Sequence, residues 1–228
     1  MTSRLRTLTH CSVRRVTLLL LGLLGAACAS KPPAPDWQIN AFASLRVYSS
    51  AFLSGNSRVA EIELSRARSE IAGTGRADLL ARAELTRCAV RVASLEFDDC
   101  ASYQPLASDA GAQEQAYAAF LSGRWAGIDS RLLPEQYRQL VVTAAAGASP
   151  GAVEDPLSRL VAAGVLLQRG ELSSAEIAVA AQTASNQGWR RPLLAWLGVQ
   201  FKRATDVGDA ATAARVQRRI DLVLQTQK

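Results

Sequence analysis

An acidic run and a run rich in tryptophan and arginine are the parts of this sequence whose residue types could bind a ligand. The acidic run is Glu96-Phe97-Asp98-Asp99. Carboxylates bind calcium, but calcium takes roughly six to eight oxygens in a shaped loop, and no EF-hand pattern surrounds this run. We therefore interpret it as a solvated turn, with a calcium site as the alternative. The phosphate-binding patterns GxxxxGKS, GxxxxGKT and GxGxxG do not occur in the sequence.

The second run contains the candidate partner-binding residues, which are Trp189, Arg190, Arg191 and Trp196. Tryptophan and arginine are the residue types most enriched at interface hot spots, so this stretch could hold an acidic peptide or a glycan. The alternative is that Trp196 belongs to the core, Trp189 lies at a helix junction and the arginines are solvated. A second basic face, interpreted as solvated surface, is formed by Arg215, Arg218 and Arg219.

The first 27 residues have the composition of an export signal. Residues 1–15 contain four arginines and no acid, residues 16–24 are mostly leucine, and small residues follow to position 27. A basic segment, a short apolar segment and a small-residue cleavage site make a secretory signal peptide. The apolar run is too short to span a bilayer, which takes roughly 20 residues. We expect residues 1–27 to be a signal that takes no part in the fold.

The end of this signal, Leu23-Leu24-Gly25-Ala26-Ala27-Cys28, resembles the lipobox of bacterial lipoproteins, although Gly25 stands where the family prefers leucine. The resemblance implies that Cys28 becomes the lipid-modified first residue of the mature chain. Because Ala29 rather than aspartate follows, it also implies an outer-membrane anchor that faces the periplasm. An ordinary secreted protein is the alternative. Residues 28–36 are proline-rich and predict an extended tether that reaches roughly 25 Å.

Removing the signal changes what the composition implies. Residues 1–27 carry four of the 26 lysines and arginines and no acid, so the net charge falls from +6 to +2. The only histidine, His10, is lost as well. A nucleic-acid partner therefore loses its support. A Ser-His-Asp triad and a histidine-ligated zinc site are excluded, so we expect no catalytic residue, no metal and no cofactor.

Two of the four cysteines, Cys88 and Cys100, remain in the exported domain once Cys11 and Cys28 are assigned to the N-terminal segment. Two cysteines in an exported domain are usually paired, because the compartment is oxidising. We expect a structural disulfide, and the alternative is two free buried thiols or a redox pair.

The remainder of the chain, residues 37–228, predicts an all-α domain of about nine helices. Alanine is abundant, aromatic residues make up 6% of the chain, and no long alternating β-rich segment stands out. Glycines and helix-starting residues divide the domain. The clearest start is Ser173-Ser174-Ala175-Glu176, which has capping-box spacing. We also expect Ser57 to cap the second helix, Pro134 to lie in the first turn of another, and Pro192 to open the next to last.

The pentapeptide AFLSG occurs twice, at 51–55 and at 119–123, which is a separation of 68 residues. This spacing, together with Gly55, Ala60 and Ala67, resembles the tetratricopeptide (TPR) repeat, whose units are about 34 residues long. The resemblance implies a TPR-like array of antiparallel helical hairpins in which the pentapeptide closes the first helix of a hairpin. The later glycines do not keep the period, so an irregular α-helical bundle is the alternative.

These observations predict a non-catalytic, lipid-anchored periplasmic scaffold with a groove for an envelope protein or peptide. Its setting would be the assembly or maintenance of the outer membrane or cell envelope, an expectation based on fold-level analogy and cellular place. The alternative function is a protein that binds cell-wall glycan or processes it with a pair of carboxylates. An open groove lined by arginine and aromatic side chains would favour the scaffold, and a deep cleft with two carboxylates would favour the enzyme.

Overall fold

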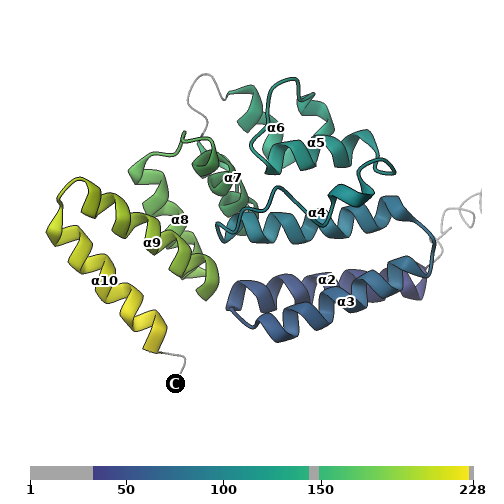
Figure 1. Cartoon of the computed structure of the whole chain (residues 1–228), viewed down its shortest axis with the longest axis horizontal. Helices are drawn as coiled ribbons and strands as arrows, with labels where there is room; N and C mark the ends of the chain where they lie inside the picture. Colours follow the sequence, from purple (N-terminus) through teal and green to yellow (C-terminus); the bar gives the residue numbers. More distant parts are fainter. Residues whose placement is uncertain (1–32, 144–148, 226–228) are drawn as a thin grey trace, which may run out of the picture. The chain divides into compact units, whose positions relative to one another are not determined.

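The computed structural model describes residues 33–143 and 149–225, and these residues fold into helices without any strand (Figure 1). The chain divides into two units, Met1–Pro35 and Asp36–Lys228, and every described helix belongs to the second. Nine α-helices occur in the described residues, which confirms the all-α prediction. They are α2 (Asp36–Ser54), α3 (Ser57–Ala72), α4 (Ala77–Ala93), α5 (Ala112–Leu121), α6 (Glu135–Val142), α7 (Pro156–Gln168), α8 (Ser174–Asn186), α9 (Arg190–Asp206) and α10 (Ala210–Gln225).

Within residues 33–143 and 149–225, three short 3-10 helices lie between them, namely η2 (Gln104–Leu106), η3 (Ser130–Leu132) and η5 (Pro150–Ala152). None of the helices in the described ranges is long and apolar enough to cross a membrane.

The repeated pentapeptide is a helix stop. Gly55 has φ +90° and Gly123 has φ +70°, a conformation that glycine adopts without a Cβ penalty. After the first copy, the Gly55 N–H donates to Phe52 O and the next N–H donates to Ala51 O, and the second copy repeats both bonds. This is the Schellman pattern, which satisfies the last carbonyls of a helix. The same pair of bonds also ends α7, α8 and α9.

Only the first copy closes a helical hairpin. It lies between α2 and α3, which pack against each other along their lengths (Figure 1). Ala60 and Ala67 of α3 are fully buried there, as the TPR-like spacing predicts. The second copy ends α5, but α6 begins only at Glu135, after a stretch that contains η3. The expectation that each copy closes the first helix of a hairpin is therefore wrong for the second copy, because the motif specifies a helix end and does not specify the next element.

The helix starts follow the predicted capping chemistry with three corrections. Ser173 and Glu176 form both hydrogen bonds of a capping box, as expected. The cap of α3 is Asn56, which accepts from the Val59 N–H, and Ser57 is the first helical residue. Pro134 is the N-cap of α6 and precedes its first turn. Helix α9 begins at Arg190, two residues before Pro192, because a proline is tolerated throughout the first turn of a helix.

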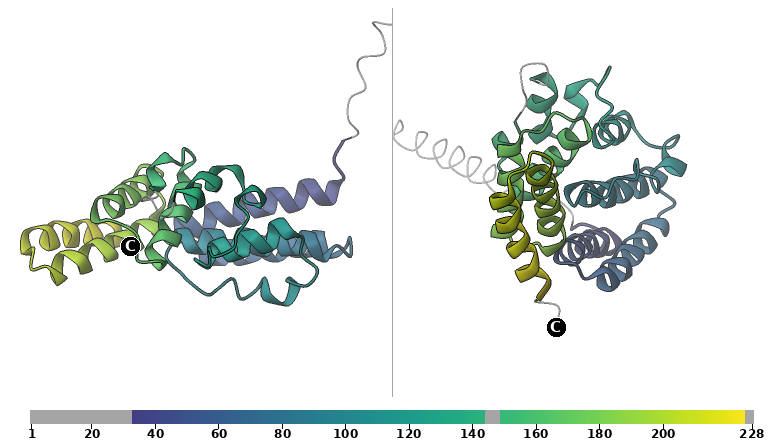
Figure 2. Two further views of the ribbon diagram at one scale, coloured as in Figure 1. Left: turned by 90° about the horizontal axis from the view of Figure 1, so that it is seen from above. Right: turned by 60° about the vertical axis from the view of Figure 1, so that its left-hand side comes forward.

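The core is formed by helices that are distant in sequence. Helix α4 packs on α7, while α8, α9 and α10 pack as consecutive hairpins (Figure 2). Helix α9 also contacts α2. The aromatic residues of α5 and α6 form a stacked group with Trp125, in which Phe120 and Tyr137 have ring centroids 4.7 Å apart. These contacts fix the positions of the helices that carry the candidate site residues.

Candidate functional site

The Trp-Arg stretch lies at the start of α9, where that helix meets the α2–α3 hairpin. Trp189 is the N-cap of α9, and its half-buried side chain packs against two groups of buried side chains, one that includes Trp196 and one that includes Phe52. Arg190 is half-buried beside Gly55. The placement of Trp189 agrees with the alternative of a residue at a helix junction.

Among the described residues, Arg191 makes four contacts, which involve Phe52, Ser57 and Glu96. Its Nε–H donates to Phe52 O at 2.8 Å, and its guanidinium lies 4.1 Å from the centroid of the Phe52 ring. Its other nitrogens donate to Ser57 Oγ at 2.6 Å and to Glu96 Oε1 at 3.0 Å. One side chain therefore ties α9 to the C-terminus of α2, the start of α3 and the loop after α4. The interpretation of this arginine as merely solvated needs correction, because each of its three nitrogens already donates a hydrogen bond within the domain.

Trp196 is fully buried, and its indole N–H donates to Ala93 O at 3.1 Å. The side chain fills the space between α9 and the C-terminus of α4. This burial agrees with the alternative that Trp196 belongs to the core, and the prediction that it contacts a partner has no exposed surface to support it. The structure therefore does not bring the four predicted residues together on one exposed surface.

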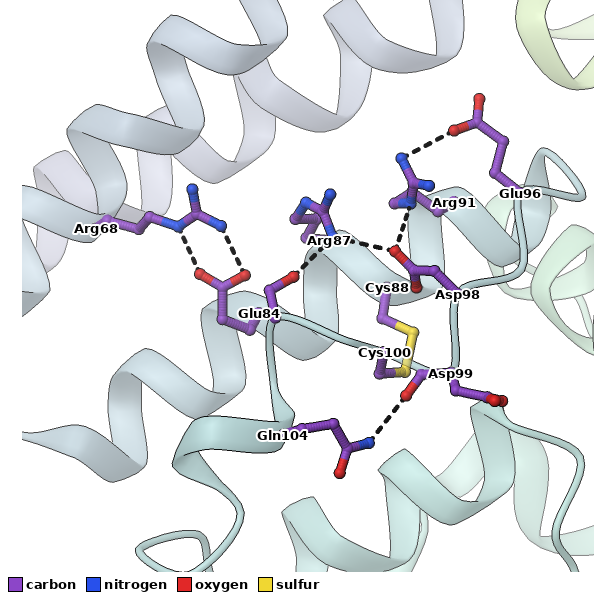
Figure 3. Close-up of polar contacts among 11 residues, drawn as sticks. Arg68, Glu84, Arg87, Cys88, Arg91, Glu96, Asp98, Asp99, Cys100 and Gln104 are labelled. Carbon is purple, nitrogen blue, oxygen red and sulfur yellow. Dashed lines mark hydrogen bonds and ion pairs between the residues drawn. A yellow bond between two sulfur atoms is a disulfide. The ribbon is translucent and has the colours of Figure 1, made fainter.

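Glu96 and Asp98 of the acidic run pair with arginines of α4 (Figure 3), and Glu96 also pairs with Arg191 of α9 at 3.0 Å. Arg91 pairs with Glu96 at 2.9 Å and with Asp98 at 3.2 Å, and Arg87 lies 3.5 Å from Asp98. Within the described ranges, no group of three or more potential metal ligands is close enough to hold an ion. The interpretation of the run as a solvated turn needs correction, because Glu96 and Asp98 form ion pairs that attach the loop to α4.

Cys88 and Cys100 form a disulfide, as predicted. Their Cα atoms are 5.1 Å apart, and the bond joins α4 to the loop that also carries the acidic run (Figure 3). Both cysteines are buried. The bond is therefore a structural link, and the ion pairs of Asp98 also hold this loop on α4. The proposed lipidation site Cys28 lies outside the described residues.

Replacing both Cys88 and Cys100 with alanine should lower the free energy of unfolding by roughly 2–4 kcal/mol, because the closed loop no longer restricts the unfolded chain. Chemical denaturation with and without reductant measures the effect. Reductant should destabilise the wild type and leave the double variant unchanged. Two free thiols in a non-reducing peptide map of the native protein would contradict the disulfide.

A groove of about 660 Å³ is formed by α8, α9 and α10. Its floor is aliphatic and includes Ile177 from α8, Ala204 from α9 and Val216 from α10, all of which are buried. Val207 lies at its edge and is 78% exposed. We call this feature the α8–α10 groove.

Three arginines line the α8–α10 groove, and they differ in what they contact. Arg203 donates to Leu172 O at 2.9 Å, which holds its guanidinium against the turn before α8. Arg215 donates to the Thr212 hydroxyl at 3.0 Å. Arg219 makes no hydrogen bond and no ion pair with any residue in the described part of the chain. The wall formed by α10 therefore carries two guanidiniums without an ion pair among the described residues, although the charge of Arg215 acts on the nearby Asp209 and helps to lower its pKa.

The two carboxylates of the groove are both engaged. Asp206 pairs with Lys202 at 2.8 Å. Asp209 accepts from the Thr212 backbone N–H at 2.9 Å, and this bond to the start of α10 holds the pKa of Asp209 below its ordinary value. A general acid needs a raised pKa, so Asp209 is unsuited to that role.

No protein-family model matches the chain, and no curated protein or solved structure matches it either. The function must therefore be argued from the chemistry of the chain's own surfaces.

The α8–α10 groove is not predicted by the sequence, although two of its residues belong to the basic face of the last helix. That face is interpreted from the sequence as solvated, whereas Arg215 and Arg219 line the groove together with Arg203. Their spacing of four residues on an amphipathic helix is the available signal, since it places both on one side of a helix. What the sequence could not indicate is the aliphatic floor that α8 and α9 place beside them.

Proposed function

We propose that the protein is a non-catalytic, lipid-anchored helical scaffold of the periplasm that binds segments of envelope proteins in the α8–α10 groove. The observation that carries this proposal is the groove itself, in which an aliphatic floor lies beside two guanidiniums that form no ion pair within the described residues. Buried apolar area with a few well-placed polar groups is the usual composition of a binding site. The lipobox resemblance at Cys28 supplies the anchor, and a TPR-like arrangement of hairpins remains part of the proposal.

Two features support a scaffold over the glycan-processing alternative. The carboxylates of the groove are held by Lys202 and by the start of α10, so neither is free to act as an acid–base pair. The buried carboxylates Glu84 and Glu114 are likewise each paired with an arginine, Arg68 and Arg82 respectively. Carboxylates that are paired in this way stabilise the fold and are poor candidates for catalysis.

The membrane anchor is tested by the Cys28→Ala variant. We expect the wild-type protein to fractionate with membranes and the variant to appear in the soluble periplasmic fraction, because acyl chains can no longer be attached. The Cys88→Ala variant serves as a control for loss of a cysteine and should stay with the membranes. Unchanged partition of Cys28→Ala would contradict the lipoprotein proposal without affecting the argument for the groove.

The scaffold role is tested by chemical crosslinking in intact cells, after which the protein is recovered from membranes. The groove variant is Ala178→Trp, in which an exposed alanine of the groove wall is replaced by a large side chain. The control is Ala211→Trp, because Ala211 is exposed at the start of α10 and does not line the groove. We expect specific partners with the wild type and with the control, and their loss with Ala178→Trp. Partners that persist in Ala178→Trp would place the binding surface elsewhere.

A further inference from the structure

We infer that the ligand of the α8–α10 groove is an acidic peptide segment whose carboxylates pair with Arg215 and Arg219 and whose aliphatic side chain lies on the groove floor. This inference rests on the proposed function and names the chemistry of the partner.

The spacing of the two arginines determines where the negative charges must lie. Arg215 and Arg219 are one helical turn apart on α10, so their side chains leave the helix on the same side. Both line the groove. Two cations at this separation are best matched by two anionic groups along an extended chain. Arginine is also the residue type best suited to carboxylates, because its planar fork can donate two parallel hydrogen bonds.

The existing contacts leave these donors available. Arg219 has no hydrogen bond or ion pair among the described residues, and the one hydrogen bond of Arg215 there is with a neutral hydroxyl, although its charge also acts on the nearby Asp209. Salt bridges within the described ranges occupy most other arginines of the domain, such as Arg169 with Glu171 at 2.6 Å. Three arginines and two aspartates line the groove, and Asp206 already pairs with Lys202, so the groove keeps an excess of positive charge. An incoming carboxylate would gain two charge-assisted interactions there without displacing an internal ion pair.

The floor of the groove argues for a peptide over a small anion. The nearly covered side chains of Ile177, Ala204 and Val216 form the bottom of the groove, and exposed apolar surface lies beside them at Ala178 and Val207. A free phosphate or carboxylate would leave this surface exposed to water. A segment with an aliphatic side chain between acidic residues would cover the floor and reach both guanidiniums at once. Apolar contact gives affinity, and the charges fix the register.

The test uses the full-length protein in detergent and fluorescent peptides that are blocked at both ends. The acidic probe is Gly-Asp-Leu-Glu-Ile-Asp-Gly, the matched probe replaces its acids with Asn and Gln, and the third replaces them with lysine. Fluorescence anisotropy should show binding of the acidic probe at least about tenfold tighter than that of the amide probe, as expected when a charged hydrogen-bonding partner is lost. The affinity should fall with added salt because the charges are near the surface.

Substitutions of single and paired arginines test which side chains bind the acidic probe. The double variant Arg215→Ala/Arg219→Ala should bind the acidic probe about tenfold more weakly than the wild type. Arg218→Ala should bind it with unchanged affinity, because Arg218 belongs to the same helix but does not line the groove. Arg215→Glu/Arg219→Glu should prefer the lysine probe. This reversal also excludes loss of folding as the cause. Equal binding of the acidic and amide probes, or an Arg218→Ala effect equal to that of the double variant, would overturn the inference.

The outcomes separate this inference from the proposed function. If the amide probe binds as well as the acidic probe and Ala178→Trp abolishes both, the groove binds peptides and only the acidic preference is wrong. If inorganic phosphate displaces the acidic probe more strongly than sodium chloride of equal ionic strength, the site takes small anions and the inference is wrong. If no peptide of any charge binds while a glycan fragment does, both the inference and the scaffold function fail.

Discussion

Replacing Gly164 with alanine should lower the free energy of unfolding by roughly 3 kcal/mol, a large effect for the addition of one methyl group. Gly164 is buried in α7, where α7 crosses α4. A Cβ at this position would lie 2.4 Å from Val92 O and 3.1 Å from Val92 C. Because these are backbone atoms, no side chain can rotate away, and the two helices must separate. Thermal denaturation should show a melting temperature lower by roughly 6–12 °C.

Gly198→Ala is the matched control, because it places the same substitution in the interior of α9. A Cβ there would meet nothing within 4 Å. The control should be neutral or more stable by about 0.5–1 kcal/mol, since alanine restricts the unfolded chain and favours the helix. If the two variants melt at the same temperature, the close approach of α4 and α7 is not present in solution.

The contrast between these glycines shows what the sequence can and cannot indicate. Gly55 and Gly123 are recognisable as helix stops, because a left-handed residue after an apolar helix is a local feature. The capping box at Ser173 is recognisable for the same reason. Gly164 lies in a helix interior, and its requirement comes from Val92, which is far away in sequence. Local patterns therefore predict the number and the ends of the helices, and leave their packing undetermined.

The same limit applies to the candidate site. The sequence indicates that the arginines and tryptophans near position 190 are unusual, but not what they contact. Arg191 meets Phe52, which lies 139 positions earlier, so its role as a link between helices depends on the tertiary arrangement. The α8–α10 groove requires three helices to be placed before its floor exists. The type of residue is informative in both places, whereas its burial and its partners are set by distant parts of the chain.

Trp196→Ala should lower the free energy of unfolding by roughly 3–5 kcal/mol, the range observed when a buried aromatic residue is truncated. The indole is fully buried, and its N–H satisfies Ala93 O at the end of α4. Truncation leaves both a cavity and an unpaired carbonyl between α4 and α9. Chemical denaturation measures the loss, and Trp196→Phe separates the two causes. Phenylalanine restores most of the volume, so Trp196→Phe should lower the free energy of unfolding only by the cost of the lost hydrogen bond, roughly 1–3 kcal/mol.

Trp37→Ala is the control for removal of a tryptophan, because Trp37 is only half-buried in the first turn of α2. Its loss of stability should be clearly smaller than that of Trp196→Ala.

The decisive comparison for Trp196 combines the stability measurement with the crosslinking experiment. If Trp196→Ala unfolds at the wild-type denaturant concentration but no longer recovers the partners, Trp196 would be a binding residue, as the sequence pattern predicts. If the variant is destabilised and Trp196→Phe recovers the partners, the role of Trp196 is to hold α9 on α4. The α8–α10 groove then depends on Trp196 only through the position of α9.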